Sequence, residues 1–574
     1  MVPSHQSRLF SSPSHNQSPL KNHFTWLILS LLFTLFYSTL GLQKAFSSEY
    51  VVQDDAREYV FWMQRFLDSE LFPQDLIANY FQSITPLGYA TLYKVIAAWG
   101  MSPLLFSKIL PVFLSIIITI YSFQLSIKIF PIPLAGFLST LLLNQSLWFK
   151  YDVISGTPRA FIYPLFLAFI YYLLQRSWVY IAFIMLIAGL FYPLLLFIIL
   201  GTLCWRLGSN YRQNYRLLGF FLMLGCLILL PYALSTSEFA PVVTYTQAKL
   251  MPEHWTEGRH PFFDSNALKF WLFGQHSGIF PPLMPPIIWL GLLLPWMRQK
   301  PSQFPLLAAI KPETKILYQL LIVSLFLFLA AHIFFLKLFF PTRYTIHTFR
   351  IIMSLSGGIV LTVLLDNFTR FFAREMRRRG KLHRFSILGI VGICLIFVLF
   401  VSPHLFKYFP KTDYRRGENP ELYKFLQQQP KDSLIATLAD EADNLPTFTQ
   451  RPILVGREYA LPFHLGYYSQ IRQRVIDLIN ATYHPNLTVV QDFIQKYQVK
   501  FWLLESGNFQ PEYLQQKSWL KSFNPAYGEA IKGLEKGEQS ALAKVAEKCT
   551  VFTSGRFRLI GTACIHSSQE KSSR

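Results

Sequence analysis

Residues 24–59 read FTWLILSLLFTLFYSTLGLQKAFSSEYVVQDDAREY. The first part, residues 24–42, has no charged side chain and is long enough to cross a bilayer as a helix. A signal peptide is the other interpretation of such a run, but no small-x-small cleavage site follows it. An uncleaved anchor is therefore favoured. The chain then places Asp54 and Asp55 side by side next to the membrane, where each carboxylate raises the pKa of the other.

The composition of the whole chain is that of a polytopic membrane protein. Of 574 residues, 52% are hydrophobic and only 15% are charged, whereas a typical soluble domain has about 25% charged residues. The net charge of +21 is concentrated in residues 1–406, which carry 31 Lys and Arg against 15 Asp and Glu. Basic residues between apolar segments indicate on which side of the membrane a loop lies, and they contact lipid headgroups. The expected partner of this charge is the lipid bilayer, and nucleic acid is not expected.

Apolar runs predict about 11 transmembrane helices. Segment 87–99 is not counted among them, because it is bracketed by Pro86 and Pro103, contains Lys94 and is short. It is predicted as a juxtamembrane or re-entrant helix. The predicted spans lie near residues 24–43, 103–130, 132–149, 160–175, 177–190, 192–207, 217–235, 282–297, 316–338, 347–368 and 385–406.

The positive-inside rule then orients the chain. With a cytoplasmic N-terminus, residues 370–384, which contain seven Lys and Arg, fall on the cytoplasmic side. An odd number of crossings leaves the C-terminus outside. The predicted domains are a disordered cytoplasmic tail (1–23), a transmembrane domain (24–406) with outer loops 44–102 and 236–281, and an extracytoplasmic domain (407–574). The expected location is the cytoplasmic (plasma) membrane, as in the inner membrane of a bacterial-type cell envelope.

The C-terminal part alternates strand-like and helical runs, which is typical of a small α/β domain. Residues 433–438, 452–456 and 501–505 are strand-like, and VVQDFIQKY at 489–497 is helical. Residues 549–565 are predicted to form a hairpin. Cys549 and Cys564 are expected to pair across it if this part faces an oxidising compartment. The predicted fold class is thus mainly α, a polytopic membrane protein with a small C-terminal α/β domain.

The residues that follow the acidic pair predict an amphipathic helix along the membrane surface. Its apolar positions follow the helical period from Ala56 to Leu67. Asp55 and Glu58 fit a capping box, with Asp55 as N-cap. Asp54 has no capping duty, so it is the better candidate for chemistry. Asp75 stays open between a second acid and a turn residue.

The order of these motifs resembles the first outer loop of the GT-C glycosyltransferases, and most of all their bacterial mannosyl- and arabinosyltransferase-like members. Many of these proteins have an Asp-Glu-Ala-x-x-Tyr-like element here. The Asp-Asp pair departs from that pattern, which leaves open which carboxylate is the base. The resemblance spans roughly residues 24–235. It rests on Asp54-Asp55-Ala56 and Tyr59, on Pro86, Tyr89 and Leu92, on Gly100-Met101-Ser102, and on SGTPRAFIYPLFLAFIYYLLQR at 155–176.

The resemblance implies a reaction. The donor would be a sugar on polyprenyl phosphate, and the acceptor a glycan, lipid or protein on the outer face. An Asp of the first outer loop, Asp54 or Asp55, would act as base in an inverting transfer. The leaving phosphate would need Arg, Lys or a metal. Arg159, Arg343, His347 and Arg350 are the candidates on that face, although basic residues at span edges commonly only meet headgroups.

The second outer loop reads PEHWTEGRHPFFD at 252–264. His254, Trp255, His260 and Asp264 are the candidates there for binding the sugar or the acceptor. An ordinary lid loop is the alternative. The His and Asp spacing matches no metal motif, so no cofactor is assigned and a divalent metal stays an open alternative.

Two other functions remain as alternatives. A secondary transporter would carry ionisable residues within its spans, and the predicted spans contain almost no Asp or Glu. A lipid flippase without such a proton or ion relay stays open. A non-catalytic membrane scaffold would present the C-terminal domain to a partner. The sequence contains no Gly-x-x-x-x-Gly-Lys-Ser/Thr loop, Gly-x-Ser-x-Gly elbow or His-Glu-x-x-His motif, so ATP-driven pumping and zinc proteolysis have no support.

Overall fold

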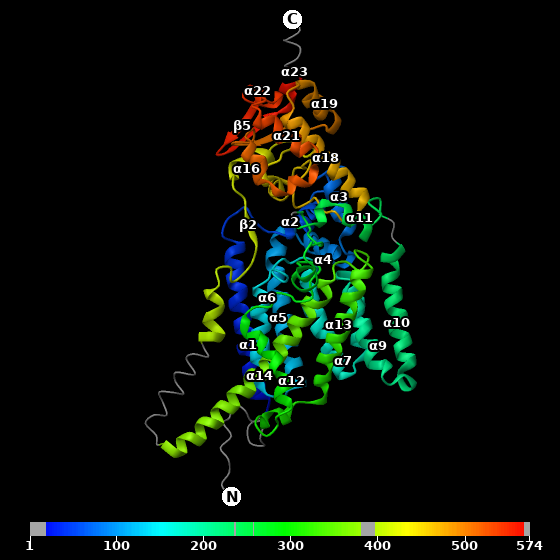
Figure 1. Ribbon diagram of the computed structural model, residues 1–574, viewed down its shortest axis with the longest axis vertical. Helices are drawn as coiled ribbons and strands as arrows, with labels where there is room; N and C mark the ends of the chain where they lie inside the picture. Colours follow the sequence, from blue (N-terminus) through cyan, green and yellow to red (C-terminus); the bar gives the residue numbers. More distant parts are fainter. Residues whose placement is uncertain (1–18, 235–236, 257, 380–396, 568–574) are drawn as a thin grey trace.

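The computed structural model describes residues 19–234, 237–256, 258–379 and 397–567. Long helices occupy one end of the molecule, and a small sheet with short helices occupies the other, near the C-terminus (Figure 1). The first group comprises α1 (Pro19–Ala45), α2 (Ala56–Tyr59), α3 (Leu76–Ile84), α4 (Leu87–Ala98), α5 (Pro103–Ile129), α6 (Pro133–Trp148), α7 (Ile162–Gln175), α8 (Trp178–Phe191), α9 (Leu195–Gly208), α10 (Tyr211–Leu234), α11 (Tyr245–Leu250), α12 (Leu294–Arg298), α13 (Lys315–Ile333) and α14 (Thr342–Arg379).

Five of the described helices are long and apolar enough to cross a membrane: α1, α5, α10, α13 and α14. Three shorter apolar helices accompany them, namely α8, α9 and the continuous segment Pro286–Arg298. The mainly helical, multi-pass membrane architecture expected from the sequence is therefore confirmed. The figure of about 11 crossings stays a prediction, since by length and composition only five described helices qualify.

Two of the sequence predictions fall partly outside the described residues. The tail was expected over residues 1–23, but α1 begins at Pro19, and residues 1–18 lie outside the described part. The last predicted span covers residues 385–406. Of it, residues 397–405 form two short turns of π- and 3-10 helix, and residues 385–396 lie outside the described part.

Close helix contacts build the core of the membrane region. Helix α6 is buried along its whole length, and it packs against α14 where two small residues meet. A Cβ added to Gly358 on α14 would lie 2.2 Å from the Ser139 hydroxyl oxygen of α6. Ser139 in turn donates a hydrogen bond to the Leu355 carbonyl at 3.3 Å. Small residues at such a crossing let two helix backbones approach closely.

The single amphipathic surface helix predicted after Asp55 is wrong. The segment forms the short helix α2 and then a 3-10 helix, η1 (Phe61–Phe66). Both faces of this segment are covered by protein, because Arg57 and Glu58 are buried together with Phe61 and Trp62. The sequence pattern missed this because the polar face pairs with charged residues far along the chain.

The capping box predicted for Asp55 is also wrong. Asp55 precedes α2 but its side chain makes no capping hydrogen bond. The Gln53 side-chain oxygen accepts instead from the backbone N–H groups of Asp55 (2.9 Å) and Ala56 (3.3 Å). Asp75, left open by the sequence, is the N-cap of α3 and accepts from the Ala78 N–H at 2.8 Å. The Asp55 carboxylate is thus available for a partner elsewhere.

The C-terminal region contains a four-stranded sheet in the order β3-β4-β6-β5. Only β3 and β4 are parallel. The strands are β3 (Ile435–Ala436), β4 (Phe501–Glu505), β5 (Thr550–Ser554) and β6 (Phe557–Gly561), and the helices are α16 (Pro420–Gln427), α17 (Leu445–Thr449), α18 (Leu465–Tyr483), α19 (Leu487–Tyr497), α20 (Pro511–Gln516), α21 (Ala526–Glu535), α22 (Ala541–Ala546) and α23 (Thr562–Ser567). A disulfide joins Cys549 and Cys564 across the β5–β6 hairpin.

A second, two-stranded sheet ties the C-terminal region to the first outer loop. Strand β1 (Val51–Gln53) pairs antiparallel with β2 (Tyr414–Arg416), so that Val52 faces Arg415. One contiguous hydrophobic core runs from the membrane helices into the C-terminal sheet. The acidic pair at residues 54 and 55 therefore follows a buried strand that is paired with the C-terminal region.

A candidate active site between the first outer loop and the C-terminal region

A cavity of about 420 Å³ lies where six segments meet. They are the first outer loop, the loop between α6 and α7, the turn between α8 and α9, the second outer loop, the connection from α13 into the start of α14, and the start of the C-terminal region. Charged side chains from five of them, all but the turn between α8 and α9, face the cavity. The charged side chains that line it are Asp54, Asp55, Glu58, Arg159, Arg259, Arg343, Arg415, Arg457 and Glu458, and the histidines His260 and His276 line it as well.

Asp54 is held at the cavity by its backbone and by two arginines. Its N–H donates to the Asp413 carbonyl at 3.0 Å, which extends the β1–β2 pairing. Arg415 donates from Nε to Oδ1 and from Nη2 to Oδ2, both at 3.1 Å, and Arg57 also donates to Oδ1. Burial raises the pKa of Asp54, but the hydrogen bond from Arg415 and the charges of both arginines outweigh it and leave the pKa below its usual value.

Asp55 is paired with Arg159, from the loop between α6 and α7. Burial raises the pKa of Asp55 above its usual value, although the charge of Arg159 opposes the shift. The two adjacent carboxylates thus differ in surroundings. Asp54 has both oxygens bound to guanidinium groups, whereas Asp55 contacts Arg159 through Oδ2. In electrostatic terms Asp55 accepts a proton more readily than Asp54.

A buried aspartate that the sequence did not single out organises the cations behind the cavity. Asp152 Oδ1 lies 3.3 Å from Arg159 Nε, and its Oδ2 lies 3.0 Å from Arg350 Nη1. Burial raises the pKa of Asp152, but the charges of Lys150, Arg159 and Arg350 hold it well below its usual value. Asp152 therefore fixes the orientation of Arg159. The one feature of the sequence that could have pointed to Asp152 is that it is a lone acid, close to Lys150, at the end of an apolar run.

Arg343 and the exposed Arg457 are the two cavity arginines that have no ion pair among the described residues. The Arg343 guanidinium lies 5.8 Å from the centre of the Phe339 ring. Among the described residues, no carboxylate lies within ion-pair distance of it, yet its charge acts on Asp55. Lys150 lies near these arginines and adds to the positive charge of the site. Burial lowers the pKa of its ammonium group to about 8. A cation that faces a cavity without a protein counter-ion is suited to an anionic ligand.

On the opposite wall, Arg259 joins the second outer loop to two glutamates. It contacts Glu58 at 3.4 Å and also Glu458. Burial raises the pKa of Glu58 well above its usual value, and the nearby Glu458 carboxylate raises it further. This cluster connects the first outer loop, the second outer loop and the C-terminal region in one place. No simple sequence pattern predicts it, since residues 58, 259 and 458 lie far apart in the chain.

Two histidines and their aromatic neighbours form the rest of the wall. The His276 ring stacks on Phe340 with centroids 4.2 Å apart, and the His260 ring lies 4.8 Å from that of Phe463. Burial and the charge of nearby arginines lower the pKa of both imidazoles well below its usual value. His260 Nε2 is buried and has no hydrogen-bond partner among the described residues. It is a neutral ring that can still accept or donate one hydrogen bond.

The structure brings together half of the predicted site residues. Asp54, Asp55, Arg159, His260 and Arg343 line one cavity. The others do not line it: His347 and Arg350 are buried behind it, and His254, Trp255 and Asp264 lie elsewhere on the second outer loop.

The residues behind the cavity form a hydrogen-bonded cluster. Arg350 donates to Ser146 at 3.1 Å, to Asp152 and to Tyr163. His347 Nδ1 lies 2.9 Å from the Tyr163 hydroxyl oxygen. Arg350 is only 1% exposed. These residues support Asp152 and Arg159 from behind, so any effect on a ligand in the cavity is indirect.

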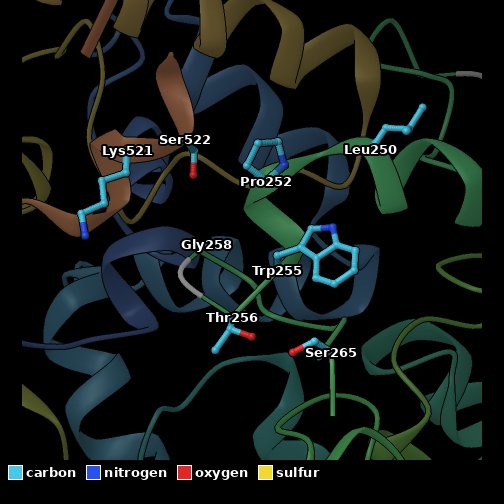
Figure 2. A pocket seen from close by; sticks show the side chains of 8 residues that line it. All are labelled: Leu250, Pro252, Trp255, Thr256, Gly258, Ser265, Lys521 and Ser522. Carbon is cyan, nitrogen blue, oxygen red and sulfur yellow. The ribbon is translucent and has the colours of Figure 1, made fainter. Parts of the chain in front are cut away.

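The remaining loop residues have structural contacts. His254 is buried, and its Nε2 lies 3.1 Å from the Pro462 carbonyl oxygen, to which it donates as a neutral ring. Asp264 is paired with Lys269 at 2.7 Å. Trp255 lines a separate, open cavity of about 470 Å³, together with Ser522 of the C-terminal region (Figure 2). Its indole N–H donates to the Lys249 carbonyl at 2.9 Å.

Comparison with known proteins identifies the fold. No protein-family model and no curated protein sequence matches this chain. Among solved structures, it is similar to the archaeal oligosaccharyltransferase AglB from Archaeoglobus fulgidus in complex with an inhibitory peptide and a dolichol-phosphate. The TM-score is 0.56 at 11% identity, over 88% of this chain and 72% of that chain.

Two further structures of the Archaeoglobus fulgidus oligosaccharyltransferase are similar to the same degree. One is the apo form, with a TM-score of 0.53 at 11% identity over 92% of this chain and 72% of that chain. The other is tethered to an acceptor peptide, with a TM-score of 0.53 at 11% identity over 88% of this chain and 72% of that chain. At this identity the likeness shows a shared fold alone.

Proposed function

We propose that this chain is an integral-membrane glycosyltransferase of the GT-C type, which moves a sugar from a polyprenyl-phosphate donor to an acceptor. One observation carries the proposal: a single cavity joins the acidic pair of the first outer loop to Arg159 and Arg343. The fold likeness supports it, since one of the similar structures holds dolichol-phosphate and another an acceptor peptide. The acceptor of this chain is a glycan, a lipid or a protein.

The transfer is a single displacement. The acceptor O–H attacks the anomeric carbon, its proton passes to an Asp carboxylate, and the new glycosidic C–O bond forms. The bond from the anomeric carbon to the phosphate oxygen breaks, and its electron pair leaves with the lipid phosphate. Attack opposite to the leaving group inverts the anomeric centre. A positioned base of this kind contributes about 10²–10⁴-fold to the rate.

The cations of the cavity suit the leaving group. Arg343 has no carboxylate partner among the described residues, and Asp152 orients Arg159. Both would bind the donor phosphate and stabilise the charge that it gains as the bond breaks. The buried His347 and Arg350 would act through Asp152 and Tyr163. His260 and His276 would bind the sugar or the acceptor, whereas Trp255 would contact a more distant part of the acceptor.

The described part of the chain has no ready set of protein ligands for a metal ion. No group of three or more His, Cys, Asp and Glu side chains comes together there as metal ligands would. Each cavity carboxylate is instead close to an arginine. The assay below, run with and without EDTA, measures whether a divalent metal takes part.

The topology that we propose has about 11 crossings, a cytoplasmic N-terminus and an extracytoplasmic C-terminal domain. The cavity then opens on the outer face of the cytoplasmic membrane, where polyprenyl-phosphate sugars would be used. The disulfide between Cys549 and Cys564 is in keeping with an oxidising compartment.

The decisive experiment replaces one carboxylate of the pair at a time by the neutral amide of asparagine. A deletion strain receives the wild-type chain, Asp54→Asn or Asp55→Asn at matched membrane levels, and lipid-linked sugars and surface glycans are measured by mass spectrometry. We expect the variant of the catalytic base to lose at least about 10²-fold in transfer, with the lipid-linked sugar accumulating. Asp492→Asn, an exposed site on α19, is the matched control.

The outcomes separate the candidate functions. If both site variants transfer the sugar as well as the wild type does, the acidic pair is not catalytic and the proposal fails. A flippase would leave the lipid-linked sugar intact and change only its leaflet distribution. A scaffold would tolerate all three Asp→Asn variants alike.

A further inference from the structure

A second charged cleft lies beside the proposed active site, along the β1–β2 pair. It has a volume of about 360 Å³ and is lined by the end of α1 and by the segment that leads into β2. Five cations and a single carboxylate, Asp413, are among its lining residues. The cations are Lys44, Lys407, Lys411, Arg415 and Arg416.

Most of this positive charge is not neutralised by the protein. Lys44 donates to the Pro410 carbonyl at 2.8 Å, and Lys411 lies 3.6 Å from Asp413. Within the described residues, Lys407 and Arg416 have no carboxylate within ion-pair distance. Both are exposed. A concave surface with several unpaired cations and one acid attracts an anion, and both lysine and arginine bind phosphate.

The position of the cleft indicates that the anion belongs to a lipid. Helix α1 is one of the candidate membrane spans and ends at Ala45, next to the cleft. Exposed apolar and aromatic side chains surround this end, including Phe46, Leu405, Phe406 and Tyr408, which is 72% exposed. Aromatic residues of this kind mark the level of the headgroups. A basic pocket at that level is a site for an anionic headgroup.

We propose that the cleft formed by Lys44, Lys407, Lys411, Arg415 and Arg416 binds the phosphate of a membrane lipid that ends in a phosphomonoester. This site is separate from the cavity that contains Arg159 and Arg343, and its occupancy is measured without any sugar transfer. It therefore stands or falls independently of the proposed enzymatic activity.

Arg415 connects the two sites. It lines both cavities, and in the present structure its Nε and Nη2 donate to Asp54. A phosphate in the cleft competes with Asp54 for the same guanidinium. A bound lipid phosphate would therefore weaken the hydrogen bonds from Arg415 to Asp54 and leave the one from Arg57 in place.

The experiment measures lipid binding by the purified full chain in nanodiscs. The discs contain phosphatidylcholine with or without phosphatidic acid, which carries a phosphomonoester, and bound lipid is quantified by native mass spectrometry after extraction. Three cations of the cleft are neutralised together as Lys407→Gln/Lys411→Gln/Arg416→Gln. The matched control is Lys532→Gln/Lys536→Gln/Lys544→Gln, which removes the same charge from exposed positions on α21, just after it and on α22.

We expect the wild type and the control to retain phosphatidic acid over phosphatidylcholine, and the cleft variant to lose at least about 10-fold in affinity, since each basic residue contributes substantially to headgroup binding. Equal retention by the cleft variant and the control overturns the proposal. Soluble glycerol 3-phosphate that binds as tightly as phosphatidic acid overturns the lipid part of it. Lys407→Gln alone, at an exposed side chain, serves if the triple variant does not fold.

Discussion

At the scale of single residues, the acidic pair of the first outer loop has two different environments. Asp54 is bound by Arg57 and Arg415 through both oxygens, whereas Asp55 is paired with Arg159. From the sequence, Asp54 was the better candidate for chemistry, because Asp55 was predicted to cap a helix and Asp54 was not. In the structure Gln53 caps α2, and neither aspartate does. The identity of the base thus depends on arginines that the local sequence does not reveal.

One buried acid of the same network gives a pH-dependent stability. Burial raises the pKa of Asp443 to about 7, and the Glu458 carboxylate adds to the shift while Arg57 opposes it. The folded state therefore holds a proton that the unfolded state, with an ordinary pKa of about 3.9, releases earlier. The stabilisation is fully present below about pH 4 and is lost as the pH rises through about 7.

We expect Asp443→Asn to flatten this dependence. The melting temperature of the wild type in detergent should fall relative to that of the variant between pH 5 and pH 8, with the two close together at pH 5. Thermal unfolding at a series of pH values measures it. Asp440→Asn, at an exposed position in the same turn, should keep the wild-type slope. A parallel pair of curves for wild type and Asp443→Asn would contradict the assignment.

At the scale of elements, length and apolar composition identified the helices better than they identified the ends of those helices. Helices α5 and α6 begin at prolines, which suit the first turn. The segment after Asp55 failed as a prediction because its period matched an amphipathic helix, while its polar residues are neutralised inside the protein. Periodicity reports which face is apolar, but it does not report whether the other face meets water or another charge.

The crossing of α6 and α14 gives a test at this scale. A Cβ at Gly358 would lie 2.4 Å from the Ser139 backbone nitrogen, which cannot move away as a side chain could. We expect Gly358→Val to destabilise the fold by about 1–3 kcal/mol or more. The readout is the melting temperature and the monodisperse yield in detergent.

The control for this test is another helical glycine. A Cβ at Gly219 on α10 meets nothing within 4 Å, so Gly219→Val should change the melting temperature far less. If Gly358→Val is as stable as the wild type, α6 and α14 are not in close contact at Ser139.

At the scale of the whole molecule, the C-terminal region and the membrane helices form one unit around the site. They share a continuous hydrophobic core, the β1–β2 pair and the contacts of Arg259 with Glu58 and Glu458. The proposed cavity exists only where these parts meet. A truncated C-terminal region would therefore lose one wall of the site, including Glu458.

The orientation of the chain is testable with fusions. We expect alkaline phosphatase to be active when fused after Arg574, because we propose that the C-terminal domain is extracytoplasmic. The same enzyme fused after Arg212, near the start of α10 on the side that we assign to the cytoplasm, should be inactive there, and a green fluorescent protein fusion should give the reverse pattern. The same result at both positions would contradict the odd number of crossings that we propose between Arg212 and the C-terminus.

The sequence by itself determined the class of molecule, because hydropathy over whole segments reports burial in lipid without any knowledge of packing. It also indicated the chemistry-bearing pair Asp54 and Asp55, and arginines 159 and 343, since charged residues beside apolar spans are few. Only the tertiary structure decided which of these side chains meet. Asp152, Arg259, Arg415 and Glu458 come from distant segments, and ion pairing in a buried site depends on distances of a few ångströms that no local pattern encodes.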